Sequence, residues 1–366
     1  MSGDYREETR DHPPVTRNTR LGHVPALDGI RGLAILLVVA YHFLGLPGGF
    51  YGVDLFFVLS GFLITTLLLE EHAATGRVSL RAFYLRRARR LLPALAAVLA
   101  FTCLLAALAF ATGRYGSGRS LTEGVAACLF YAANVFRMLG HALPLNLTPM
   151  WSLAEEEQFY FIWPALFILL SARLRPARLG LLLGILAIAM TAWTAGITLH
   201  GGATGRVYFG PDTRSTGLLI GSAFAAARAA GLRIPRIPLA APIALAAVAA
   251  LAALVHGGTF AFAAGFPLVE LAGLALIVAA LADSRLLAVR PLVAVGTISY
   301  GVYVWMATVA IVAPHGIIPL VAALGIGWLS TRWIEQPFRR RSRPATDDVS
   351  PQAKHHPVRA LEQAAS

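Results

Sequence analysis

The chain of 366 residues is 57% hydrophobic and only 14% charged, with a mean hydropathy of +0.65. This composition is too apolar for a soluble globular domain of that length, so it predicts a protein embedded in a lipid bilayer. The formal charge of +12 does not indicate nucleic-acid binding, because the basic residues fall in short clusters between apolar runs, as in membrane proteins oriented by their loops.

The two ends of the chain differ from its middle. Residues 1–24 are polar, carry charges of both signs and lack the apolar core and cleavage site of a secretory signal. Residues 340–366 are too polar to bury apolar surface. We therefore expect disordered cytosolic segments at 1–24 and 340–366, on either side of one membrane domain at 25–339.

Within this domain, ten runs are mostly apolar and about 20 residues long, which is the length needed to cross ~30 Å of hydrocarbon. The sequence therefore predicts an all-α, polytopic membrane protein with about ten transmembrane helices. The predicted spans are residues 26–46, 53–69, 91–112, 151–171, 179–199, 213–229, 237–256, 261–282, 292–313 and 316–333.

The distribution of arginine predicts the orientation of these spans, because cytoplasmic loops are enriched in Lys and Arg. Six arginines lie between residues 70 and 92 and three between 172 and 179, whereas residues 47–52 contain none. Ten spans with both termini in the cytosol satisfy this rule at every loop. Residues 122–139 are then a half-inserted or interfacial helix, and the protein is expected to be a multi-pass protein of the inner (cell) membrane.

The first predicted span, PALDGIRGLAILLVVAYHF, contains Arg31 and His42. Ionisable residues inside a membrane helix are costly and usually face the protein interior or a watery cavity. A histidine can take a proton from a hydroxyl near neutral pH and return it, so His42 is a candidate general base. The alternative is a buried histidine that hydrogen-bonds to a neighbouring helix. His42 lies about 24 Å along the helix from Ala26, at ~1.5 Å per residue.

The second predicted span begins GGFYGVDLFF and places Asp54 near its outer end. This carboxylate could orient or charge-stabilise the imidazole of His42. Alternatively, Asp54 could be a helix cap in the first turn, where its charge meets the positive end of the helix dipole. The two roles are compatible.

The run FYLRRARRLLP contains four arginines just before the third predicted span. Arginines three apart share a helix face, so Arg87 and Arg90 would form a fork for phosphate oxygens, aided by Arg86 and by the N–H groups of the helix start. The alternative is a plain signal of cytosolic orientation.

The fourth predicted span opens with WSLAEEEQFYFIWP. Three consecutive glutamates cover ~200° of a helix, so they cannot all face one way, and at least one should point inward. Glu155 could close a capping box on Ser152 at a solvated rim. That explanation does not extend to Glu156 and Glu157, which are candidates for the site.

Together these motifs resemble the acyltransferase 3 family of integral membrane acyltransferases over nearly the whole membrane domain. The motifs that carry the resemblance are, in chain order, LDGIRGLAILLVVAYHF, GVDLFFVLSGFLIT, FYLRRARRLLPAL, WSLAEEEQFYFIWP, GTISYGVYVWM and WIEQPFRR. The resemblance implies a ten-helix fold, acyl-CoA as the donor and a carbohydrate or related hydroxyl as the acceptor, with no metal.

The resemblance also implies roles for individual residues. Arg31 and His42 match the catalytic pair, and Arg87 and Arg90 match the paired arginines ahead of a proline, here Pro93. The positions that match the motif of the fourth helix are Glu156, Glu157, Gln158 and Tyr160. Where the family has an apolar residue this chain has Glu155, whose part in the site is therefore open.

We therefore expect a membrane-embedded enzyme that moves an acyl group, in particular acetyl from acetyl-CoA, to a hydroxyl of a carbohydrate-containing acceptor such as a cell-envelope glycan. His42 acts as the base, either directly or through an acyl-histidine intermediate. The groups expected to position substrates or stabilise charge are Arg31, Asp54, Glu156 and Glu157, and those expected to hold the phosphates of the donor are Arg86, Arg87 and Arg90.

Two alternatives are compatible with the same sequence. The acceptor could be the sugar of a secreted, macrolide-type antibiotic instead of an envelope glycan. From a different class, a transporter or flippase would also have ten helices with intramembrane charges. However, the ionisable residues concentrate before Tyr160 and leave a blander second half, which favours a localised catalytic site.

Overall fold

The computed structural model describes residues 21–111, 118–234, 236–282 and 284–340, and every regular element in these ranges is helical. The helices are α1 (Pro25–Leu44), α2 (Gly52–Thr75), α3 (Leu80–Ala111), α4 (Gly118–Leu129), α5 (Ala133–Met138), α6 (Met150–Ser171), α7 (Pro176–Leu199), α8 (Thr204–Phe209), α9 (Pro211–Arg214), α10 (Thr216–Ala229), α11 (Ala240–Leu254), α12 (Gly258–Phe260), α13 (Phe266–Leu281), α14 (Arg290–Thr297), α15 (Ser299–Val312), α16 (Ile317–Leu329) and α17 (Gln336–Arg340). Short 3-10 or π turns lie at Gly49–Tyr51, Leu145–Leu147, Ala261–Gly265 and Ser330–Glu335. The predicted all-α class is confirmed.

Six of the described helices are long and apolar enough to cross a membrane, and the pair α14–α15, bent by 71°, makes a seventh if it counts as one span. Helix α6 has 22 residues but is not among them, because its three glutamates fall in every window of sufficient length. Helices α10 and α11 are apolar but shorter. Each predicted span overlaps a helix or a pair of helices, while the count of ten stays a prediction.

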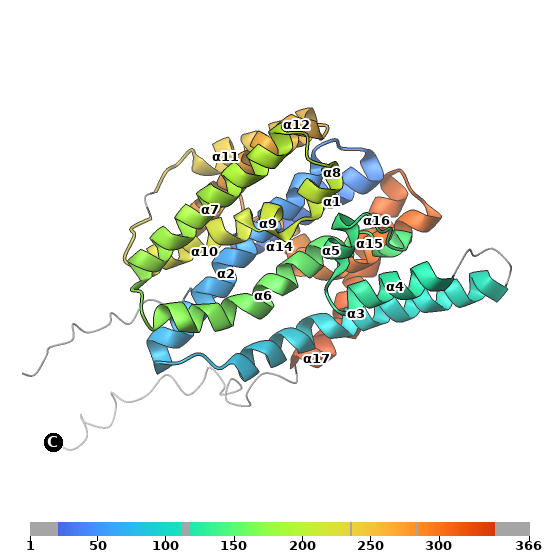
Figure 1. Ribbon diagram of the computed structural model, residues 1–366, viewed down its shortest axis with the longest axis horizontal. Helices are drawn as coiled ribbons and strands as arrows, with labels where there is room; N and C mark the ends of the chain where they lie inside the picture. The colour runs from blue at the N-terminus through green and yellow to red at the C-terminus, as the bar shows by residue number, and fades with distance from the viewer. Residues whose placement is uncertain (1–20, 112–117, 235, 283, 341–366) are drawn as a thin grey trace, which may run out of the picture.

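The predicted interfacial segment at 122–139 forms α4, a turn at Tyr131 with a positive φ of 52°, and the short helix α5. Helix α4 folds back along α3 at one edge of the bundle (Figure 1). The predicted disordered segments lie outside the described residues, except for 21–24 and for Arg340, which ends helix α17. The Leu21 amide donates to the carboxylate of Glu70 over 2.5 Å.

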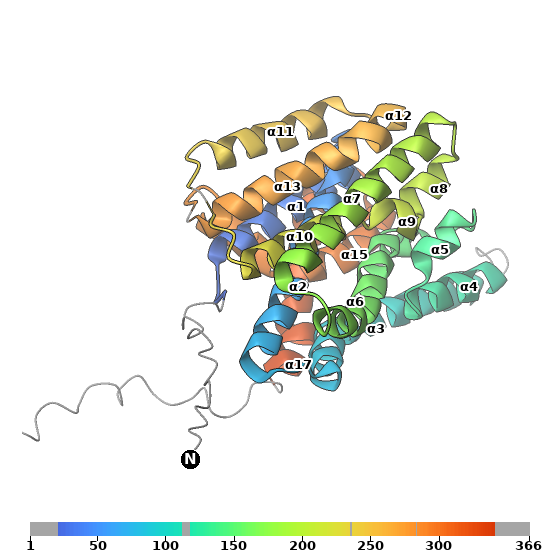
Figure 2. The same cartoon turned by 60° about the vertical axis from the view of Figure 1, so that its left-hand side comes forward.

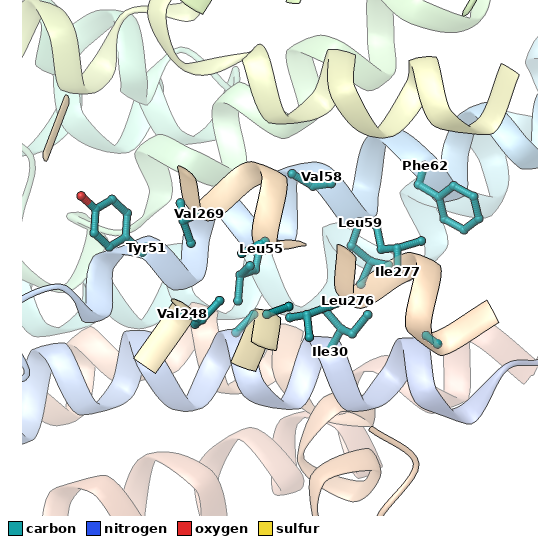
Figure 3. Packing of buried hydrophobic residues seen from close by; sticks show 14 of the residues in the cluster. Ile30, Tyr51, Leu55, Val58, Leu59, Phe62, Val248, Val269, Leu276 and Ile277 are labelled. Carbon is teal, nitrogen blue, oxygen red and sulfur yellow. The ribbon is translucent and has the colours of Figure 1, made fainter. Parts of the chain in front are cut away.

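The largest apolar core joins the first two helices to the last third of the chain. Helix α13 lies between α11 and α1 (Figure 2). Ile30 of α1 and Leu55 and Leu59 of α2 pack there with Leu276 and Ile277 of α13 (Figure 3). This packing fixes α1 and α2 side by side and antiparallel.

Close helix contacts at glycines set two of the interfaces. A Cβ on Gly29 would lie 1.7 Å from the carbonyl oxygen of Leu287, and a Cβ on Gly296 would lie 1.8 Å from that of Asp28. Helices α1 and α14 therefore touch backbone to backbone, as small residues allow in membrane bundles.

Helix α2 meets α10 in the same manner, because a Cβ on Gly61 would lie 2.0 Å from the carbonyl oxygen of Leu218. Gly61→Ala should therefore destabilise the fold by about 1–3 kcal/mol through overpacking. Gly184→Ala in α7 is the matched control, since nothing lies within 4 Å of its Cβ. Thermal melting of the detergent-solubilised variants, followed by size-exclusion chromatography, measures the difference. Equal melting temperatures would show that the α2–α10 contact yields more easily than the structure implies.

Candidate functional site

A cavity of about 600 Å³ runs along one face of α2. The α2 residues that line it recur every three or four positions from Val53 to Glu70, so the lining extends about 26 Å along the helix axis at ~1.5 Å per residue. The opposite walls come from α3, α6 and α15, with Arg31 contributed by α1. The length of the cavity approaches the thickness of the hydrocarbon core of a bilayer.

One end of this cavity is basic, and we call it the arginine end. Four arginines line the cavity there: Arg31, Arg86, Arg87 and Arg90. The structure thus brings the three predicted phosphate ligands together with Arg31. Arg31 donates to Asp28 over 2.7 Å, and Arg86 lies 3.5 Å from the carboxylate of Glu71.

Arg87 is the most constrained of the four. Its guanidinium donates to Glu157 over 2.8 Å, and its Cζ lies over the ring of Tyr160, 3.4 Å from the centroid. The prediction that helix-start N–H groups assist the fork is wrong, because α3 begins at Leu80 and Arg87 lies about two turns inside it. The packing of that earlier segment on the rest of the bundle extends the helix beyond the motif.

Glu156 and Glu157 both face the cavity, as predicted for at least one of the glutamates. Glu156 accepts hydrogen bonds from Ser60 of α2 and from Tyr160, one turn further along α6. Glu157 holds Arg87. The middle of the cavity is therefore a polar belt with charges of both signs, in which a hydroxyl and a carboxylate are in direct contact.

Glu155 points away from this cavity. Its carboxylate is 1% exposed and accepts from Asn134 of α5 over 2.6 Å and from Ser215, next to α9. The capping-box explanation is wrong, because the cap of α6 is Pro149 and Ser152 lies inside the helix. Glu155 instead ties two short outer helices to the helix that carries Glu156 and Glu157.

Removing this carboxylate should therefore leave buried donors on α5 and beside α9 unpaired. We expect Glu155→Ala to cost about 1–3 kcal/mol of stability. Glu155→Gln should cost less, since one of its two side-chain oxygens is kept. Melting temperatures of the solubilised variants test the order, and it fails if Glu155→Gln melts no higher than Glu155→Ala.

His42 lies beyond the far end of the cavity and is not one of its lining residues. It is eleven residues from Arg31, which brings the two side chains within about 20° of the same face of α1 and about 16 Å apart. Val38, one turn before His42, packs in one cluster with the cavity residues Val53 and Phe57. His42 thus continues the stripe of α1 that faces the cavity.

The orientation of the His42 ring is set by its own helix. Its Nδ1 lies 2.8 Å from the carbonyl oxygen of Val38, and Tyr41 packs edge-on against the ring. A carbonyl can only accept, so Nδ1 carries the proton and Nε2 is left as the acceptor. That tautomer is the one a general base needs.

Asp54 is placed differently from its predicted role beside His42. It is fully buried and forms an ion pair with Arg214 of α9, with Nη1 and Oδ1 2.9 Å apart. The Arg214 guanidinium also lies 3.7 Å from the ring centroid of Phe266. Asp54 does occupy the first turn of α2, but the predicted cap is wrong, because the N-cap residue is Tyr51 and no side chain in the described part of the chain caps the helix with a hydrogen bond.

The sequence alone did not identify Arg214 as a site residue. Arg214 lies at the edge of a predicted loop, where an arginine bears only on the orientation of the spans. A usable signal was present, since PDTRSTGLLIG places an arginine directly before an apolar run. The hydroxyls of Ser60, Ser152 and Tyr303, which line the cavity, were also missed. Single hydroxyls in apolar helices carry no distinctive spacing.

The described ranges contain no group of three or more His, Cys, Asp and Glu placed to hold a metal ion. The cavity offers acid–base and electrostatic groups, namely three carboxylates and four guanidinium groups, and the stripe of α1 beyond its far end adds the Nε2 acceptor of His42.

Comparison with known proteins adds to this geometry. A family model described as an acyltransferase domain matches residues 24–331. The peptidoglycan O-acetyltransferase OatA of Listeria monocytogenes is 32% identical over 362 residues, which cover 89% of this chain and 58% of the relative. The putative peptidoglycan O-acetyltransferase YrhL of Bacillus subtilis is 33% identical, with 87% and 55% covered. The chain thus spans little more than half of either relative, and no solved structure matches it.

Proposed function

The chain belongs to the acyltransferase 3 family, and from that premise we propose that it transfers an acetyl group from cytosolic acetyl-CoA to a hydroxyl of a cell-envelope glycan. The observation that carries the proposal is the cavity, which begins among four arginines and ends level with the stripe of α1 that leads to His42. Relatives named for the O-acetylation of peptidoglycan support the choice of acceptor.

The donor is proposed from the chemistry of the arginine end. Phosphate groups pair with guanidinium groups in bidentate fashion. Arg90 and Arg86 face the cavity beside Arg87, so a phosphorylated nucleotide can be held at the mouth while its thioester arm extends along α2. The apolar side chains on either side of Ser60, from Phe56 to Leu67, suit such an arm.

The reaction is proposed at the other end. Nε2 of His42 takes the proton of the acceptor hydroxyl, whose oxygen attacks the thioester carbon. The carbon–sulfur bond breaks, and the thiolate takes the proton back from the imidazole. An acyl-histidine intermediate uses the same nitrogen and balances in two steps. Arg31, Glu156 and Glu157 are proposed to position groups or stabilise charge in the passage, whereas Asp54, which does not line it, is held by Arg214.

We propose ten spans with both termini in the cytosol, in the inner (cell) membrane. Helix α6, the short helices α10 and α11 and the bent pair α14–α15 then complete the count. This orientation puts the arginine end on the cytosolic side, where acyl-CoA is available, and His42 toward the outer side, where the glycan lies. Fluorescent-protein fusions at both termini should be bright and phosphatase fusions inactive.

The test of function uses purified full-length chain in proteoliposomes. Labelled acetyl-CoA is supplied with a soluble oligomer of β-1,4-linked N-acetylglucosamine, and the sugar product is weighed by mass spectrometry for one added acetyl group. Release of free coenzyme A with an acetylated sugar supports the proposal. Movement of a solute across the vesicle without coenzyme A release would identify a transporter instead.

A further inference from the structure

A hydrogen-bonded pair, Ser152 and Tyr303, lines the far end of the cavity. Val53 of α2, Ser152 of α6 and Tyr303 of α15 all line the cavity. Ser152 lies four residues before Glu156 and Val53 seven before Ser60, so this end is about 6–10 Å past the contact between Glu156 and Ser60 at ~1.5 Å per residue.

Tyr303 is held in place from two sides. Its hydroxyl donates to the carbonyl oxygen of Pro149 over 2.8 Å and shares a hydrogen bond with the buried Ser152. Because a phenol has one proton, the Ser152 hydroxyl is the donor to Tyr303. The two bonds fasten α15 to the first turn of α6.

The space behind this ring is already filled. Tyr303 packs against a cluster that includes Val38, Val39 and Trp151. A group that enters from the arginine end therefore meets a fixed aromatic wall beside the stripe of His42, and cannot extend further without displacing the ring and both hydrogen bonds.

We infer that Tyr303, held by Ser152, sets the length of acyl group that the protein accepts, and limits it to short chains such as acetyl. This inference rests on the proposed function. An acetyl group on the thioester ends at the wall, beside the stripe of α1 that leads to His42. A longer chain has to occupy the volume of the ring, so its thioester stops short of the base.

The experiment compares acetyl-CoA with hexanoyl-CoA as donors for the full-length chain in proteoliposomes, with the same sugar oligomer as acceptor and coenzyme A release as the readout. We expect wild type to prefer acetyl-CoA by about tenfold or more in kcat/KM, as pockets discriminate by methylene groups. Tyr303→Val, which removes the ring, should shift the ratio toward hexanoyl-CoA by about tenfold or more. Tyr303→Phe keeps the ring and should keep most of the preference.

Tyr300→Phe is the matched control, because Tyr300 also lines the cavity but donates to the Leu91 carbonyl nearer the arginine end. Its ratio of donors should equal that of wild type. If Tyr303→Val does not fold, Ser152→Gly removes the partner and should shift the ratio in the same direction by a smaller factor. An unchanged ratio in a folded, active Tyr303→Val or Ser152→Gly would overturn the inference alone. If the wild-type protein consumed neither donor, both the proposed function and this inference would be overturned.

Discussion

Replacing His42 with alanine should reduce acetyl transfer by a factor of about 10²–10⁴, the range that a positioned general base contributes. The variant should still fold, because the imidazole is only half-buried and hydrogen-bonds to a carbonyl of its own helix. Donor binding should also persist, since Arg31, at the arginine end, lies about 16 Å away along α1. Initial rates of coenzyme A release, with acceptor saturating, measure the loss.

His200→Ala is the matched control for this result. Its Nδ1 also lies 2.8 Å from a carbonyl oxygen four residues back, that of Gly196, but it sits at the exposed end of α7. Its rate should be that of wild type. Near-normal transfer by the His42 variant would remove the proposed base from the mechanism, whatever the control does.

The second large effect concerns stability. Replacing Arg214 with methionine leaves Asp54 as an uncompensated charge with no exposed surface, and breaking such a pair typically costs about 3–5 kcal/mol. A second buried carboxylate, that of Glu270, lies close to the helix that follows Arg214. It is 3.2 Å from the position that a Cβ on Gly217 would take. We therefore expect the Arg214 variant to melt far below wild type, and Asp54→Asn to behave similarly.

A nearby pair gives the control. Arg206 and Asp212 also form an ion pair, but their side chains are 34% and 43% exposed, against 1% and 0% for Arg214 and Asp54. An exposed pair contributes about 0–1 kcal/mol, so Arg206→Met should melt close to wild type. The double variant Asp54→Asn, Arg214→Met should be more stable than the sum of the two single losses predicts. Additive losses would mean that the two charges do not stabilise each other.

The sequence alone predicted those features that depend on the residue types and helical spacing within a single segment. It predicted the all-α membrane class, and it identified the arginines of α3 and the glutamates of α6, which the structure brings to one cavity. Each of these features is visible as a run of residues within one apolar helix. Arg31 could also be placed, since its charge is unusual inside a span.

The remainder depends on contacts between distant segments. Asp54 and Arg214 are 160 residues apart, and nothing local to either shows that they meet. The orientation of Glu155 depends in the same way on Asn134 and Ser215. The sequence shows a single apolar run at 292–313, whereas the structure breaks it at Ile298, where α14 stays against α1 and α15 turns to pack on α16.

The glycine contacts of α1 bear on how the donor range of such an enzyme can change. At Gly29 and Gly296 backbone packs against backbone. Helix α1, which carries Arg31, therefore has no side chain at these contacts that a substitution could make smaller, and a larger one would clash. Adaptation to bulkier donors must then proceed through residues that point into the passage from the other walls, such as Leu63, Leu67 and Phe83. Variation in substrate scope should accumulate on that side, while the α1–α14 seam stays the same.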